Sequence, residues 1–114
     1  MKSMMNTNTP NKSFVNFLPE LIEYPDSGII SKVIFKDKNC QHTLLCLAKL
    51  AKLEEHTSPR NAAINVIQGK GILTLEGEEI KLEPGVFVFM KAHAPHALQA
   101  SENLAFVLTH SEKP

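Results

Sequence analysis

The second half of the chain consists of short runs of alternating apolar and polar residues, separated by turn-forming residues. Gly77-Glu78 parts two such runs, because glycine reaches the positive φ that tight hairpin turns require. Glu83-Pro84-Gly85 forms a second turn, in which proline presets the backbone. Many short strands with turn signals about every 8–12 residues are typical of a β-sandwich or barrel. We predict strands over Ala62–Ile67, Ile72–Glu76, Glu79–Leu82, Val86–Met90, His96–Ala100 and Leu104–His110.

The first half of the chain has a less regular pattern. We predict strands over Phe14–Leu18 and Ile29–Phe35, and a helical turn over Pro19–Tyr24. The segment Leu44–Glu55 is ambiguous, because its apolar residues follow an i, i+3, i+4, i+7 spacing and it is rich in helix-forming residues. We nevertheless predict a strand over Cys40–Lys49, since tertiary context commonly overrides local propensity and a lone helix would interrupt a barrel.

Length and charge narrow the class of protein. The 114 residues are enough for one domain with a single hydrophobic core. The 12 Lys and Arg residues balance the 12 Asp and Glu residues, so no net charge draws the chain to nucleic acid or to anionic lipid. No apolar run is longer than Leu44–Ala48, far below the roughly 20 residues that span a bilayer. We therefore expect neither a nucleic-acid partner nor a membrane association.

The N-terminus and the cysteines indicate the compartment. Residues 1–13 are mostly polar and have no apolar core of a secretory signal, so we predict a disordered leader before a single domain over residues 14–114. Cys40 and Cys46 would lie roughly 20 Å apart along one strand. A disulfide needs Cα atoms within about 7 Å, so we expect two unpaired thiols in or near the core. Both observations favour the reducing cytoplasm.

Two groups of residues have the spacing of known motifs. The run from His56 to Gly69 follows the pattern H-x-H-x3-E-x6-G, with Ser58 at the second His and Ala62 at the Glu. Pro84-Gly85 is followed after ten residues by Pro95-His96-Ala97-Leu98, as in a second motif. On these residues the chain resembles the cupin superfamily, specifically small single-domain proteins of the "cupin 2" conserved-barrel type, from around Phe14 to Thr109.

The resemblance implies an all-β fold, a jelly-roll barrel of the RmlC-like cupin type that is usually a homodimer, with a ligand pocket in its mouth. It places His56, Ser58, Ala62 and His96 in that pocket. Members of the superfamily include metal-dependent oxygenases, isomerases and lyases, and also sugar-binding and regulatory modules. The fold therefore does not fix the function.

A typical cupin metal site has three imidazoles and one carboxylate. On one extended strand, residues 56, 58 and 62 would point to the same side, but Ser58 is a poor ligand and Ala62 is none. His56 and His96 alone fall short of the usual three or four protein ligands. His93, three residues before His96, is the candidate third ligand. We expect a divalent transition metal to be weakly held or absent.

Three functions stay open on the sequence. The first is a pocket for a small polar metabolite, in which His56 and His96 can exchange protons near neutral pH. The second is a metal-dependent isomerase, lyase or dioxygenase. The third is a non-catalytic sensing or structural dimer in which these histidines are remnants. We expect His42 and His110 at the surface, and we assign Gly69 to the turns that shape the barrel.

Overall fold

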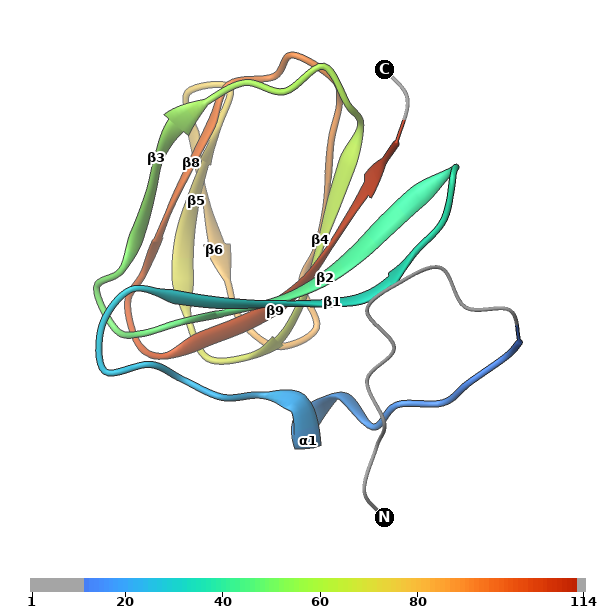
Figure 1. Ribbon diagram of the computed structural model, residues 1–114. Coiled ribbons are helices and arrows are strands. Elements are labelled where there is room, and N and C mark those ends of the chain that lie inside the picture. The colour runs from blue at the N-terminus through green and yellow to red at the C-terminus, as the bar shows by residue number, and fades with distance from the viewer. Residues whose placement is uncertain (1–11, 113–114) are drawn as a thin grey trace.

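The computed structural model describes residues 12–112, in which short alternating segments form strands as predicted (Figure 1). Most of the predicted leader, residues 1–11, lies outside the described residues. No helix in the described part is long and apolar enough to cross a membrane. The elements are α1 (Leu18–Leu21), β1 (Ile29–Lys36), β2 (Cys40–Leu47), β3 (Lys52–His56), β4 (Ala62–Gln68), β5 (Gly71–Leu75), β6 (Glu78–Leu82), β7 (Phe87–Met90), β8 (His96–Ala100) and β9 (Leu104–Ser111).

The strands form two antiparallel sheets that face each other (Figure 1). One sheet has the order β1-β2-β9-β4-β7 and the other the order β3-β8-β5-β6. Strands far apart in sequence become neighbours, because β9 pairs with both β2 and β4, and β8 pairs with both β3 and β5. Two packed antiparallel sheets with such crossovers are a jelly roll, so the predicted fold class is confirmed.

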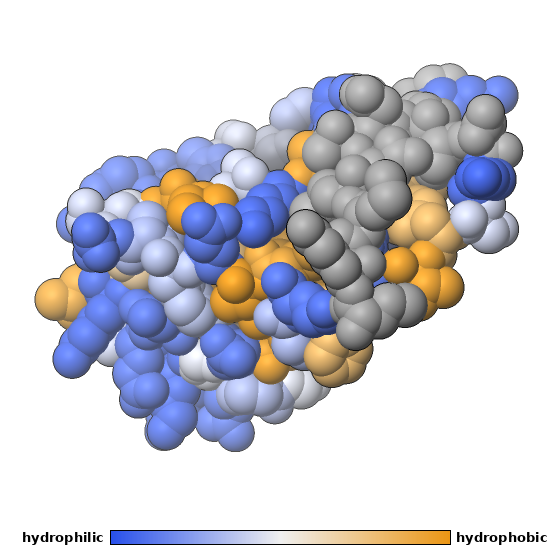
Figure 2. All heavy atoms as spheres, turned by 60° about the horizontal axis from the view of Figure 1, so that its bottom comes forward, coloured by the Kyte–Doolittle hydropathy of each residue, from blue (hydrophilic) through white to orange (hydrophobic). Residues whose placement is uncertain are grey.

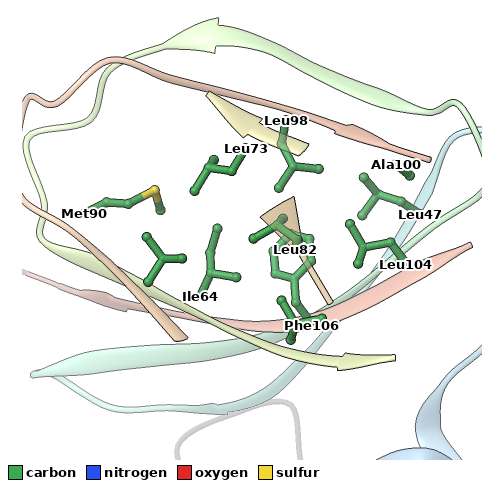
Figure 3. Close-up of a cluster of buried hydrophobic side chains, with 11 residues drawn as sticks. Leu47, Ile64, Leu73, Leu82, Met90, Leu98, Ala100, Leu104 and Phe106 are labelled. Atoms are coloured by element: carbon green, nitrogen blue, oxygen red, sulfur yellow. The ribbon is translucent and has the colours of Figure 1, made fainter. Parts of the chain in front are cut away.

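The core fills the space between the two sheets (Figure 3). Both sheets contribute to it, with Phe106 from β9 and Leu73 from β5 each about 1% exposed. Burial of such side chains is the main favourable term in folding. Met90 lies at one end of the cluster in Figure 3 and Leu104 at the other, so the cluster extends through the barrel.

The ambiguous segment forms two strands rather than a helix, and the predicted strand over Cys40–Lys49 is confirmed by β2. Both faces of β2 are covered, which explains its misleading apolar spacing. Leu45 and Leu47 face the core between the sheets, whereas Leu44 and Cys46 belong to a second cluster that includes Leu21 of α1. A strand buried on both faces has a nearly continuous apolar sequence, so alternation is lost as a signal.

The predicted strand over Phe14–Leu18 is wrong, because this segment is irregular up to α1. Its apolar side chains cover the outside of the five-stranded sheet instead, with Leu18 packed on the second cluster and the Phe14 ring 6.3 Å from that of Phe35. The helical turn predicted after it is present as α1. Figure 2 is turned to bring this side forward and shows hydrophobic groups between hydrophilic ones.

Both cysteines are free, as predicted. They lie on β2, where Cys46 is fully buried and Cys40 is half-buried. Burial raises the pKa of both thiols, because the thiolate is poorly solvated in an apolar environment. Neither thiol is therefore activated as a nucleophile.

The turn from β1 to β2 depends on the carboxylate of Asp37. Its Oδ1 accepts hydrogen bonds from the backbone N–H groups of Cys40 (3.0 Å) and Asn39 (2.7 Å), which lower the pKa of Asp37. Because the pKa of Asp37 is lower in the folded than in the unfolded state, its carboxylate stabilises the fold at any pH above the unfolded-state pKa. This stabilisation is lost as the pH falls through the folded-state pKa. Urea unfolding of Asp37→Ala should therefore show a deficit near neutral pH that narrows below about pH 3.9. Asp26→Ala, in the loop before β1, is the control and should change the stability near neutral pH by less than about 0.5 kcal/mol.

Candidate functional site

Two loops form the rim at one end of the barrel. Residues 57–61 connect β3 to β4 and residues 91–95 connect β7 to β8, and both cross the top of the barrel in Figure 1. Two hydrogen bonds join them: the N–H of His93 donates to the carbonyl oxygen of Ser58 (2.7 Å), and that of Ala92 donates to Oδ1 of Asn61 (2.8 Å). These two hydrogen bonds fix the positions of the two loops relative to each other.

A cavity of about 300 Å³ opens at this rim. Its volume is at the lower end of the range for small-molecule pockets. The structure brings together four residues that the sequence placed in the pocket, His56, Ser58, Ala62 and His96. The complete lining is His56, Ser58, Arg60, Ala62, Met90, Lys91, His96, Leu108 and His110.

The first motif is not one extended strand, contrary to our prediction. β3 ends at His56 and β4 begins at Ala62, so these residues lie on opposite sheets, with Ser58 in the loop between them. They converge because the loop carries the chain from one sheet across the mouth to the other. The pocket therefore has two walls, and each sheet provides one.

The wall on the four-stranded sheet is a pair of imidazoles. His56 of β3 and His96 of β8 are register partners, with ring centroids 4.2 Å apart and ring planes at 64°. Nδ1 of His56 lies 2.9 Å from the carbonyl oxygen of Glu54, and Nδ1 of His96 lies 2.9 Å from that of Ala94. Because a carbonyl only accepts, each Nδ1 carries the proton and donates. Nε2 of each ring is then the atom left for a ligand or a proton.

The wall on the five-stranded sheet contains five residues that the sequence did not place in the pocket. Met90 and Leu108 are apolar, and the other three, Arg60, Lys91 and His110, are basic. His110 was expected at the surface, but its side chain is only 22% exposed. The alternation of β9 explains this, because Phe106 and Leu108 face inward and His110 follows at the same parity. That signal was present in the sequence, whereas the position of Lys91 depends on the loop.

An ion-pair cluster holds Arg60 in place. Its Nη1 lies 2.7 Å from Oε2 of Glu112, and Nζ of Lys36 lies 3.4 Å from Oε1 of the same carboxylate. Nδ1 of His110 is 3.6 Å from Oε2 of Glu112. The Glu112 side chain is only 14% exposed, so these contacts are more strongly coupled than a surface ion pair. The carboxylate thereby fixes the guanidinium at the mouth of the pocket.

The residues present do not fit the usual cupin metal site. Ala62 offers a methyl group where the carboxylate would be, and the Ser58 hydroxyl accepts a hydrogen bond from the backbone N–H of Arg60 (3.2 Å). The side chain of His93 is exposed and is not among the lining residues. Within residues 12–112, no three His, Cys, Asp or Glu side chains are grouped so as to hold a metal ion. Of the three expected ligands, only His56 and His96 line the pocket.

Sequence comparison identifies the family. The model of the cupin domain family matches residues 43–110, which include both motifs and all nine lining residues of the pocket. The chain belongs to the cupin family. No curated protein sequence matches the chain significantly.

Solved structures share the fold over three quarters or more of the chain. A conserved protein of unknown function from Streptococcus pyogenes has a TM-score of 0.81 at 24% identity, covering 99% of this chain and 98% of that one. A cupin superfamily protein from Desulfitobacterium hafniense has a TM-score of 0.80 at 18% identity, covering 96% and 98%. KdgF from Halomonas sp. has a TM-score of 0.73 at 22% identity, covering 76% and 81%. At these identities the similarity shows the fold, and the function has to come from the pocket.

Proposed function

We propose that this cupin binds a small polar metabolite in the pocket around His56, Ser58, Ala62 and His96. The observation that carries the proposal is the arrangement of the two imidazoles. Both rings have Nδ1 fixed by a backbone carbonyl, and both line one cavity of about 300 Å³. The two Nε2 atoms can accept hydrogen bonds from a ligand hydroxyl group or, when protonated, donate to a ligand oxygen. A purely structural barrel needs no such cavity.

The second candidate function is a metal-dependent enzyme. A metal-bound histidine commonly donates its other N–H to a backbone carbonyl, and His56 and His96 both do so. Two imidazoles alone would hold a divalent transition metal weakly, and a metal-dependent isomerase, lyase or dioxygenase would need further ligands from solvent or substrate. Elemental analysis of protein purified without added metal separates the two candidates, because a stoichiometric transition metal would favour the enzyme.

The assembly and the location are part of the same proposal. We propose a homodimer, as the family resemblance implies, and a cytoplasmic location, which the two free thiols support. Light scattering at several protein concentrations tests the first, and a monomer at all of them would contradict it.

The pocket histidines can be tested with imidazole NMR signals and a panel of polar metabolites. A compound that fits should shift the signals of His56 and His96 in the wild-type protein. His96→Ala should weaken its binding about tenfold, the equivalent of one hydrogen bond of about 1.4 kcal/mol. His42→Ala is the control, because His42 stacks on Phe35 on the outside of the five-stranded sheet.

Equal binding by His96→Ala, His56→Ala and His42→Ala would contradict this proposal. The same samples separate a binding module from an enzyme, since a bound compound that is turned over gives new product signals. A compound that binds to His56 and His96 and stays unchanged would support a binding or sensing role.

A further inference from the structure

The pocket carries a local positive charge. Arg60 and Lys91 both line it, and its lining contains no Asp or Glu side chain. The chain as a whole has a formal net charge of zero, so this charge does not reflect a generally basic protein. A cleft lined by charge of one sign concentrates ligands of the opposite sign.

Arg60 has donors to spare for a ligand. A guanidinium presents five N–H donors in a fixed fork. In the described residues, the contacts of the Arg60 side chain to Glu112 and to His110 all use Nη1. Lys36 also contacts the Glu112 carboxylate, so two cations share one negative charge. Glu112 therefore does not fully neutralise the charge of Arg60. The donors on Nε and Nη2 remain for a carboxylate, which can accept two parallel hydrogen bonds.

Lys91 adds a second cation at the same edge of the five-stranded sheet. Ala62 and Met90 are register partners on β4 and β7, so Arg60 just before β4 and Lys91 just after β7 come from adjacent strand ends. Among residues 12–112, the Lys91 ammonium has no hydrogen bond or ion pair. An unpaired ammonium beside a held guanidinium is a suitable site for an anionic group.

The opposite wall offers a different chemistry. Nε2 of His56 and of His96 can bond a hydroxyl or carbonyl oxygen there. Met90 of β7 and Leu108 of β9 provide apolar contact on the five-stranded sheet. A water molecule takes about 30 Å³ of liquid, so the cavity of about 300 Å³ holds roughly ten non-hydrogen atoms. The cavity therefore suits a short ligand that is anionic at one end and has a neutral polar group at the other.

We propose that the pocket binds a small organic hydroxy- or oxo-carboxylate, with its carboxylate on Arg60 and Lys91 and its hydroxyl or carbonyl oxygen on His56 and His96. This inference rests on the proposed function and specifies its ligand class. The methyl group of Ala62 is compatible with such a ligand, because an acidic side chain in this cavity would repel it.

Tartrate and threitol test the inference, because they share a four-carbon hydroxylated skeleton and only tartrate carries carboxylates. We expect tartrate at millimolar concentrations to shift the imidazole signals of His56 and His96, and to bind at least about tenfold more tightly than threitol. Arg60→Gln should weaken tartrate binding at least about tenfold, and Lys91→Gln should weaken it severalfold. Added NaCl should weaken it as well.

Lys81→Gln is the matched control. It removes one cation in the same way, but Lys81 is exposed on β6 and lies outside the cavity lining, so tartrate binding should change less than about twofold. Tartrate binding that is insensitive to Arg60→Gln and Lys91→Gln would overturn the inference. Equal binding of threitol and tartrate at His56 and His96 would also overturn it but leave the proposed function standing. The absence of any shift with either compound would overturn the inference, and the metabolite panel would then decide the proposed function separately.

Discussion

Replacing Gly69 by alanine is expected to lower the free energy of unfolding by about 3–5 kcal/mol, from two additive causes. Gly69 follows β4 and has a φ of +91°, where a side chain costs roughly 1–2 kcal/mol. A Cβ atom there would also lie 1.8 Å from the carbonyl oxygen of Asn103 and 2.8 Å from Cα of Leu104. Both are backbone atoms, so the turn before β9 would have to move. Urea unfolding measured by circular dichroism gives the change.

Gly77 is the matched control for this substitution. It has a φ of +84°, close to that of Gly69, but nothing lies within 4 Å of the position that a Cβ would take. Gly77→Ala should therefore cost only the conformational part, about 1–2 kcal/mol. If Gly69→Ala destabilised the protein no more than Gly77→Ala does, the close contact with Asn103 would have no energetic importance.

Phe106→Ala is expected to lower the free energy of unfolding by about 3–5 kcal/mol, because it leaves a cavity in a core that both sheets share. Phe106 is 1% exposed and lies on β9, between β2 and β4. The lost contacts come from several strands, so the surroundings cannot collapse easily onto the space. Chemical unfolding curves with an unchanged m-value would show that the loss is one of stability.

The exposed ring of Phe87 provides the control for Phe106. It is 63% exposed on β7, at the edge of the five-stranded sheet, so Phe87→Ala should change the stability by less than about 1 kcal/mol. A loss of several kcal/mol in Phe87→Ala, or of less than about 1 kcal/mol in Phe106→Ala, would contradict the assignment of the core.

The fold was predictable mainly because turn residues and motif spacing agree along the second half of the chain. The hairpin around Gly77 joins β5 to β6 as expected, with φ values of 51° at Glu76 and 84° at Gly77. The N-terminal segment was not predictable in the same way. Apolar residues such as Phe14 serve equally well in a strand and as cover over a sheet, and sequence alternation cannot distinguish these uses.

The pocket was predicted only for the residues that the two motifs contain. His56 and His96 were found because their spacing is that of a family, and the structure pairs them across β3 and β8. Arg60 and Lys91 lie in loops, where no periodicity indicates the direction of a side chain. His110 has the same parity on β9 as Phe106, and this alternation is the sequence signal that places it in the pocket.

The pocket lies at one end of the barrel, whereas backbone hydrogen bonds between turns hold the other end together. The residues at the mouth could therefore be changed without disturbing these bonds. At the far end, backbone bonds connect the turns: Leu50 donates to Ala100, and Ser101 and Glu102 both donate to Lys70, all within 3.2 Å. At the mouth, the loops over residues 57–61 and 91–95 carry three of the pocket residues, Ser58, Arg60 and Lys91. Loop sequences could therefore be exchanged at the mouth to accept other ligands, while the interlocked far end keeps the scaffold folded.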